Sequence, residues 1–384
     1  MIKIKIGNGD RETDIRFPIS ESDLYNKLAA IHAIDSTGKQ QSVTVTGIYW
    51  PEEFSVLEGC QVDLDEMNYL AKRLDSFDDR EMDQFLIGIS MQDEPSLKNF
   101  INLTFNIDHF TLVQDISNYG KIGRAYVLNT ERAVPANDED DPKYAAIGKD
   151  LIDRGLTQIT AKGLLIYDPF DKLTEVYNGQ TFPEYAYTST LASAEVSYGG
   201  RTELLQLPDE ELAIKKAIAR LGAPSDSDCT FSFYFNYIKN DAWEKRMDGI
   251  IRNEGIYEVN KSLRSLDTDN MDWDKLSVVV EMADVQKASH ISILAEHLDD
   301  FVYFPSVADA EELAHYLVDN LSDYNMSPEM EDFFDFSAFG EQFVEERGGQ
   351  FVNGGFLYCS EYESIEELLV DVEAENEGMT MGGM

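Results

Sequence analysis

The sequence YAAIGKDL (residues 144–151) is followed 192 residues later by the related sequence FSAFGEQF (residues 336–343). In both segments apolar side chains recur at intervals of three and four around a central glycine, a spacing typical of one face of a helix. Similarity at a fixed offset is a sign of internal duplication. The rest of the chain can therefore be tested for the same offset.

Further matches occur in the same order, at offsets close to 190 residues. They join, in turn, residues 17–18 to 207–208, 42–50 to 230–238, 74–75 to 266–267, 108–110 to 299–301, and 158–166 to 350–358. A constant order and a nearly constant offset favour a tandem duplication over chance similarity.

Each copy predicts strands, then helices, then a smaller mixed part, so the expected fold class is α+β: two tandem repeats of small α+β domains in an elongated multi-domain chain. The predicted boundaries are residues 1–170 for the first repeat (strands 1–50, helices 64–105, C-terminal α/β part 108–167), residues 171–377 for the second (strands 171–238, helices 255–286, acidic C-terminal α/β part 290–360), and a disordered tail at 378–384.

Local signals place several elements of the first repeat. The alternating sequences MIKIKI and TDIRFP predict two strands, and Ser20 with Asp23 three positions later predicts the start of a helix over 21–33. Helices are also expected near 64–75, 80–90, 95–105, 116–129 and 143–154. One strand is expected around 110–113 and a single closing strand over 157–167. The stretch 168–207 alternates Tyr, Thr and Val and predicts hairpins that open the second repeat.

Composition limits the function. The chain has 384 residues, 73 Asp and Glu against 31 Lys and Arg, and a net charge of -42. Its 43% hydrophobic content excludes wholesale disorder, and its charge excludes an ordinary nucleic-acid binder, because those proteins present basic surface to phosphate. The absence of a long apolar run predicts no membrane span and no signal peptide. Three widely spaced cysteines, Cys60, Cys229 and Cys359, indicate reduced thiols and a cytoplasmic protein.

Motifs for catalysis or metal binding are weak. His290 and His297, with Glu296 and Asp299 nearby, are a poor metal candidate. The acidic series Asp267, Asp269, Asp272 and Asp274 resembles a calcium loop but has Asp272 where the sharp turn requires glycine. No phosphate-binding glycine loop and no nucleophile motif is present. The sequence therefore predicts no catalytic residues, no metal and no cofactor, and a protein that is not an enzyme.

The acidic residues are concentrated in the second half. Residues 1–192 carry a net charge of -14 and residues 193–384 a net charge of -28, and residues 288–346 hold 15 acids without one Lys or Arg. In the predicted helix 309–323, apolar Leu313, Tyr316, Leu317 and Val318 share one side. Glu312, Asp319 and Asp323 share another. Over 335–346, Phe336, Phe339, Phe343 and Val344 are expected to point inward, and Glu341, Glu345 and Glu346 outward.

Carboxylates held by such helices have a natural comparison in DNA, which carries one negative charge per about 1.7 Å of duplex axis. We therefore expect a DNA mimic whose carboxylates occupy the phosphate-binding groove of a DNA-handling protein. The candidate phosphate-mimicking residues are Asp309, Glu311, Glu312, Asp319, Asp323, Glu329, Glu331, Asp332, Asp335, Glu341, Glu345 and Glu346.

The second half of each copy resembles the antirestriction protein family ArdA, whose C-terminal part has an aromatic pattern like Y-I-D-Y-x-A-Y-G-R-D-L before a glycine-containing strand. The matching positions are Tyr144, Gly148, Lys149 and Asp150 in copy one, and Phe336, Phe339 and Gly340 in copy two. The resemblance covers about half of each repeat. It implies an acidic DNA mimic that inhibits type I restriction–modification enzymes by occupying their DNA-binding groove, with no direct contact to nucleic acid or membrane.

Two departures from the family bear on this expectation. Family members are usually about half this length and dimerise, so the duplication implies an intramolecular pseudo-dimer or a homodimer. Copy one also carries basic residues where copy two does not: Lys121, Arg124, Lys143, Lys149, Arg154 and Lys162 stand opposite Glu312, His315, Asp335, Glu341, Glu346 and Gly354. Two alternatives remain open: an acidic module that sequesters another basic DNA-binding protein, and adaptation to high salt.

Overall fold

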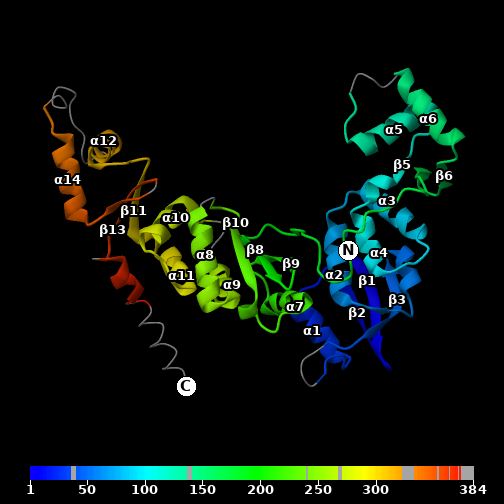
Figure 1. The fold of residues 1–384 in the computed structure, drawn as a ribbon, viewed down its shortest axis with the longest axis horizontal. Helices are drawn as coiled ribbons and strands as arrows, with labels where there is room; N and C mark the ends of the chain where they lie inside the picture. The colour runs from blue at the N-terminus through cyan, green and yellow to red at the C-terminus, as the bar shows by residue number, and fades with distance from the viewer. Residues whose placement is uncertain are drawn as a thin grey trace. The chain divides into compact units, whose positions relative to one another are not determined.

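The structure is a computed structural model that describes residues 1–35, 40–135, 141–238, 241–266, 270–321, 333–352, 354–362, 364–370 and 372. The chain forms two compact units, Met1–Thr188 and Ser189–Met384. Helices and small antiparallel sheets build both units (Figure 1), so the α+β class is confirmed. The first unit extends 18 residues beyond the boundary predicted at residue 170. The tail predicted to be disordered, 378–384, lies outside the described residues.

The first unit opens with a four-stranded antiparallel sheet in the order β2-β1-β3-β4. Its strands are β1 (Ile2–Asn8), β2 (Arg11–Phe17), β3 (Val43–Trp50) and β4 (Gln61–Val62). Ile2, Ile4 and Ile6 are fully buried, whereas the lysines between them are not. The two alternating segments therefore form strands as predicted, because alternation places one row of side chains in the core.

Helices cover the buried face of this sheet. They are α1 (Glu21–Ala30), the 3₁₀ helix η1 (Glu52–Leu57), α2 (Leu64–Asp75), α3 (Asp79–Ser90) and α4 (Leu97–Thr104). The predicted cap is present, since the Asp23 amide donates to the Ser20 hydroxyl at 3.1 Å. Helix α1 ends at Ala30, three residues before the predicted end.

A smaller layer completes the first unit. It contains the 3₁₀ helix η2 (Ile107–His109), the strands β5 (Thr111–Val113), β6 (Thr157–Thr160) and β7 (Gly163–Ile166), and the helices α5 (Tyr119–Glu131) and α6 (Pro142–Asp153). The single strand predicted over 157–167 is wrong, because the chain turns back at Thr160, whose hydroxyl donates to the Gly163 carbonyl at 2.8 Å. Leu165 joins the main core, and Leu164 and Ile166 join a second core beneath α5 and α6.

The second unit repeats this order. Its elements are β8 (Ala192–Tyr198), β9 (Arg201–Leu207), α7 (Glu211–Leu221), η3 (Asp226–Asp228), β10 (Thr230–Phe235), α8 (Asp241–Glu254), α9 (Ile256–Arg264), α10 (Trp273–Met282), α11 (Ala288–Glu296), η4 (Leu298–Asp300), β11 (Phe301–Pro305), α12 (Ala310–Asn320), α14 (Phe336–Arg347), β12 (Gln350–Val352) and β13 (Gly355–Cys359). The small sheets match in order, β5-β7-β6 and β11-β13-β12. Helix α8 was not predicted; it occupies the place of η1 and β4.

Equivalent contacts support the duplication. The side-chain amide of Asn68, on α2, accepts from the Ile19 amide and donates to its carbonyl, both at 2.9 Å. Asn260, on α9, makes the same two bonds to Asp209, both at 2.8 Å. Asn68 and Asn260 are buried. Two asparagines with the same role at an offset of 192 residues indicate that both units use one scaffold.

The strap, residues 171–188, corrects the prediction of hairpins before residue 192, because it contains no strand. Its backbone instead bonds to buried asparagines of α4 and the following loop. Asn102 accepts from the Val176 and Tyr177 amides at 2.7 and 2.8 Å, and Asn106 bonds to both backbone groups of Thr174. Buried backbone groups need partners, and here side-chain amides supply them in place of a sheet neighbour. The strap therefore belongs to the first unit.

Candidate functional site

The acidic C-terminal layer of the second unit has a rigid base. Helices α12 and α14 pack on the sheet β11-β13-β12 through a core of buried aromatic and aliphatic residues (Figure 1). The members of this core are Phe304, Val307, Leu313, Leu317, Phe343, Phe356 and Tyr358. A side chain at Gly340 would collide with the Ala310 carbonyl oxygen, so the glycine lets the two helices touch. The inward-facing residues predicted for both helices are thus confirmed as buried or half-buried.

On α12 the predicted carboxylates Glu311, Glu312 and Asp319 are exposed. Asp309 is exposed and caps the helix, accepting from the Glu312 amide at 2.9 Å. The Glu312 carboxylate in turn accepts from the Ala308 amide at 2.8 Å. Asp309 and Glu312 therefore also stabilise the start of the helix, whereas Glu311 and Asp319 make no such bond among the described residues.

Helix α14 presents its acids in the same way. Asp335 is exposed and accepts from the Ala338 amide at 3.0 Å, which caps the helix. Glu341, Glu345 and Glu346 are exposed, and Glu346 accepts from the Gln342 side chain at 2.7 Å. The outward placement predicted for these three glutamates is confirmed.

No counter-ion accompanies these charges in the described part of the second unit. None of the eight placed carboxylates ion-pairs with a Lys, Arg or His there. Arg347, at the end of α14, lies over the rings of Phe343 and Tyr358, 5.6 Å from each centroid. The remaining candidates, Asp323, Glu329, Glu331 and Asp332, fall outside the described residues.

The neighbouring sheet also faces acids. Burial, followed by the nearby charges of Asp274 and Asp272, raises the pKa of Tyr303 on β11. Its hydroxyl donates to the Gly354 carbonyl at 2.7 Å. Asp272 caps α10 by accepting from the Lys275 amide at 3.0 Å. This aspartate therefore stabilises the start of a helix. Asp267 and Asp269 lie outside the described residues.

The family-motif positions of the first unit form a helix contact. Tyr144 and Gly148 of α6 are buried, and Lys149 and Asp150 are exposed. The basic residues of this layer mostly have acidic partners: Lys143 lies 3.1 Å from Asp141, Lys162 lies 2.5 Å from Asp83, and Arg154 lies 3.5 Å from Asp150. These ion pairs were not predicted from the sequence. The spacing of four residues between Asp150 and Arg154 could have indicated that ion pair. The pair of Asp83 and Lys162 joins distant segments, so no local spacing indicates it.

The weaker candidates do not form a site. Nδ1 of His297 lies 2.8 Å from Oδ2 of Asp300. His290 lies on α11, seven residues before His297 in the sequence. Within the described ranges no group of three or more His, Cys, Asp or Glu side chains is placed to hold a metal ion. No helix in those ranges combines the length and apolarity that a membrane crossing needs.

Comparison with known proteins adds no assignment. No protein-family model matches this sequence, and no curated protein sequence matches it significantly.

Proposed function

We propose that the second unit is a DNA mimic that inhibits type I restriction–modification enzymes in the cytoplasm by occupying their DNA-binding groove. The observation that carries this proposal is the set of eight exposed carboxylates on and beside α12 and α14, without an ion-pair partner among the described residues. A merely soluble surface interleaves both signs of charge. A helical surface whose charged side chains are almost all acidic suits a partner that offers the opposite sign.

The two helices fix the spacing of the carboxylates along their axes. At about 1.5 Å rise per residue, Glu312 and Asp319 lie roughly 10 Å apart along α12, and Glu341 and Glu345 roughly 6 Å apart along α14. A groove lined with Arg and Lys is attracted to such a row, and binding costs little backbone entropy because the helices are already formed. Opposite fields also accelerate encounter, by about 10- to 1,000-fold in favourable cases.

The test is a charge reversal with a matched control. The site variant is Glu311→Lys, Asp319→Lys and Glu345→Lys combined, which leaves the helix-capping residues intact. The control, Asp10→Lys, Asp153→Lys and Glu184→Lys, changes the net charge equally but alters exposed acids of the first unit. In a DNA-cleavage assay with a purified type I enzyme, we expect the site variant to lose inhibition and the control to retain it.

Two outcomes would contradict the proposal. Equal inhibition by both variants would remove these helices from the interface, and equal loss by both would show that only the net charge matters. Circular dichroism of both variants must match that of the parent chain. If the parent chain fails to inhibit, recovery of a different DNA-binding protein that the site variant no longer binds would support sequestration of another basic protein instead.

A further inference from the structure

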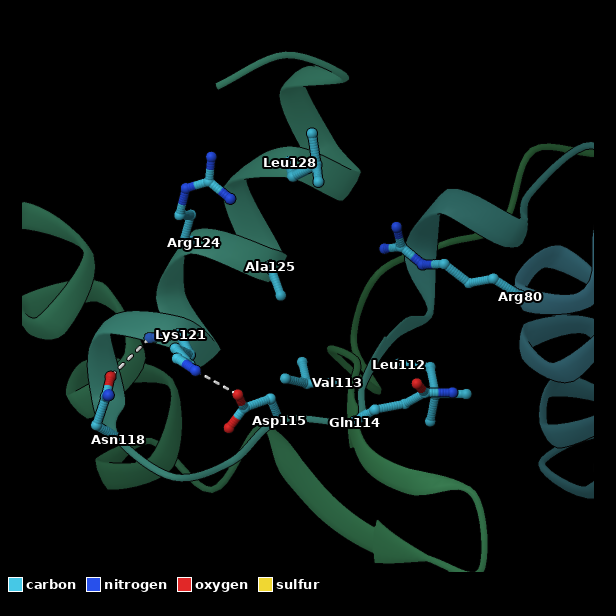
Figure 2. Close-up of a pocket in the computed structure, with 10 residues that line it drawn as sticks. All are labelled: Arg80, Leu112, Val113, Gln114, Asp115, Asn118, Lys121, Arg124, Ala125 and Leu128. Atoms are coloured by element: carbon cyan, nitrogen blue, oxygen red, sulfur yellow. Dashed lines mark hydrogen bonds and ion pairs between the residues drawn. The ribbon is translucent and has the colours of Figure 1, made fainter. Parts of the chain in front are cut away.

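A pocket of about 460 Å³ lies in the first unit between α3, β5 and α5 (Figure 2). Its walls combine two kinds of side chain. Leu112, Val113, Ala125 and Leu128 supply apolar surface, and Arg80, Lys121 and Arg124 supply cations. In Figure 2, Arg80 reaches from α3 toward α5, and the Lys121 ammonium turns to Asp115. Organic ligands commonly bind in pockets of this size and mixed lining.

The charges of the pocket do not cancel. Lys121 pairs with Asp115, and that bond, more than any other contact, lowers the pKa of Asp115 to about 2. Arg80 donates to the Asn129 side chain at 3.2 Å, and Arg124 donates to the Pro135 carbonyl at 3.5 Å. Neither guanidinium has a carboxylate partner in the described part of the chain. Among the residues that the structure describes, these two positive charges therefore have no acidic partner.

The hydrogen bonding of Arg124 is also incomplete among the described residues. Its Nε atom is buried and has no hydrogen-bond partner among the described residues. A buried N–H without a hydrogen-bond partner is destabilising. The described contacts therefore leave the Arg124 guanidinium incompletely hydrogen-bonded.

The second unit shows that the scaffold does not need these cations. At the offset of 191 to 192 residues, Arg80, Lys121 and Arg124 correspond to Asp272, Glu312 and His315. The same helices and sheet therefore form with acids at two of the three positions. Because folding does not explain the cations, binding is the better reason for them.

We propose that this pocket binds a phosphate monoester of about mononucleotide size. Such a group carries a charge of about -1.5 to -2 at neutral pH, opposite in sign to the guanidinium groups of Arg80 and Arg124 in the pocket lining. Guanidinium groups bind phosphate with paired hydrogen bonds, and the apolar wall takes the organic part of the ligand. At physiological ionic strength the screening length is about 8 Å, so acids farther than this from the pocket contribute little to its electrostatic potential.

The test uses the full chain and adenosine monophosphate as the probe, with adenosine and inorganic phosphate as the separate parts. Isothermal titration calorimetry at physiological salt should give one site for the monophosphate, and at least about tenfold weaker binding for either part alone. Arg80→Gln with Arg124→Gln should weaken monophosphate binding by about tenfold or more. Lys215→Gln, which removes an exposed cation of the second unit, should leave it unchanged.

Failure is equally defined. No binding of the monophosphate, or binding that the double variant retains, overturns the proposal. Circular dichroism and the conservative variant Arg80→Lys with Arg124→Lys, which keeps both charges and should keep more affinity than the Gln pair, separate a lost site from a lost fold. The proposal does not depend on DNA mimicry, since the charge-reversed α12 and α14 variant should bind the monophosphate normally.

Discussion

Gly148 of α6 lies directly against the backbone carbonyl of Tyr119 on α5, so that a β-carbon at Gly148 would overlap the carbonyl oxygen. The second unit repeats the arrangement, with Gly340 against the Ala310 carbonyl. Glycine at a helix crossing allows backbones to approach more closely than any side chain permits. The crossing of α12 and α14 thus depends on Gly340, whereas that of α5 and α6 depends on two glycines, since a β-carbon at Gly123 would overlap the Tyr144 carbonyl oxygen.

Gly148→Ala and Gly340→Ala should therefore each destabilise their own unit. Overpacking against backbone costs about 1–3 kcal/mol, measurable as a shift of the denaturant midpoint. Gly249→Ala on α8 is the control, because open space surrounds that position, and alanine there should be neutral or stabilising by up to about 1 kcal/mol. Equal effects at all three sites would contradict the close crossing.

Replacing the anchoring asparagines should have parallel effects in the two units. Asn68→Ala and Asn260→Ala each remove two hydrogen bonds and leave a backbone N–H and C=O without their partners. We expect a loss of about 2–4 kcal/mol in each case, seen by chemical denaturation. Asn99→Ala, at a more exposed position of α4, should cost clearly less; a similar loss there would argue against a special role for the buried pair.

The stability of the first unit should depend on pH through Glu66. Burial is the main reason that the pKa of Glu66 is raised above its ordinary value of 4.5, while the Tyr177 hydroxyl donates to the carboxylate at 2.9 Å. A raised folded-state pKa means that the folded chain holds the proton more tightly, so stability falls as pH rises past 4.5. Glu66→Gln should thus stabilise the chain at about pH 7.

The advantage of Glu66→Gln should shrink as pH falls toward 4.5, where the native carboxyl becomes protonated. Thermal denaturation of both proteins across this interval measures the difference directly and cancels the protonation of the other acids. A constant difference at all pH values would show that Glu66 is not the titrating group.

Truncation should show that the strap belongs to the first unit. Tyr177 is 2% exposed, and Phe182 stacks on Tyr69 with ring centroids 4.6 Å apart. A fragment ending at residue 188 should keep these contacts, whereas one ending at residue 170 should lose at least about 3 kcal/mol. Denaturant unfolding of the two fragments compares them. Equal stability would place the strap outside the folding unit.

Binding of the second unit to a restriction enzyme should weaken with salt. Opposite charges are screened as ionic strength rises, so the affinity should fall by at least about tenfold between about 50 and about 500 mM salt. Fluorescence anisotropy at a series of salt concentrations gives the slope. The charge-reversed variant should show a shallower slope, and a flat response from the parent chain would contradict the electrostatic proposal.

Sequence periodicity predicted much of the fold because most elements bury one regular row of side chains. The alternation of Ile2, Ile4 and Ile6 gave β1, and the spacing of Leu313 and Leu317 gave α12. Prediction failed where polar side chains, instead of a neighbouring strand, bond to the backbone. Nothing local in the strap shows that Asn102 and Asn106 will bond its backbone, and nothing in 157–167 except Gly163 marks the turn of the hairpin.

Of the two candidate sites, one could be predicted from the sequence and the other could not. The exposed glutamates of α12 and α14 could be predicted, since they lie opposite an apolar face on the same helix. The pocket could not, because Arg80 and Arg124 are 44 residues apart in the sequence and line one pocket only when α3, β5 and α5 come together. The spacing of residues in the sequence shows which side chains share one face of a helix, but not which helices pack together.

The paired anchors Asn68 and Asn260 have a consequence for engineering. Since equivalent internal bonds hold two frameworks that differ in charge at several equivalent surface positions, the outer residues can be exchanged independently of the framework. Transplanting the glutamates of α14 onto α6, with Gly148 retained, would give a protein with two anionic faces from one architecture.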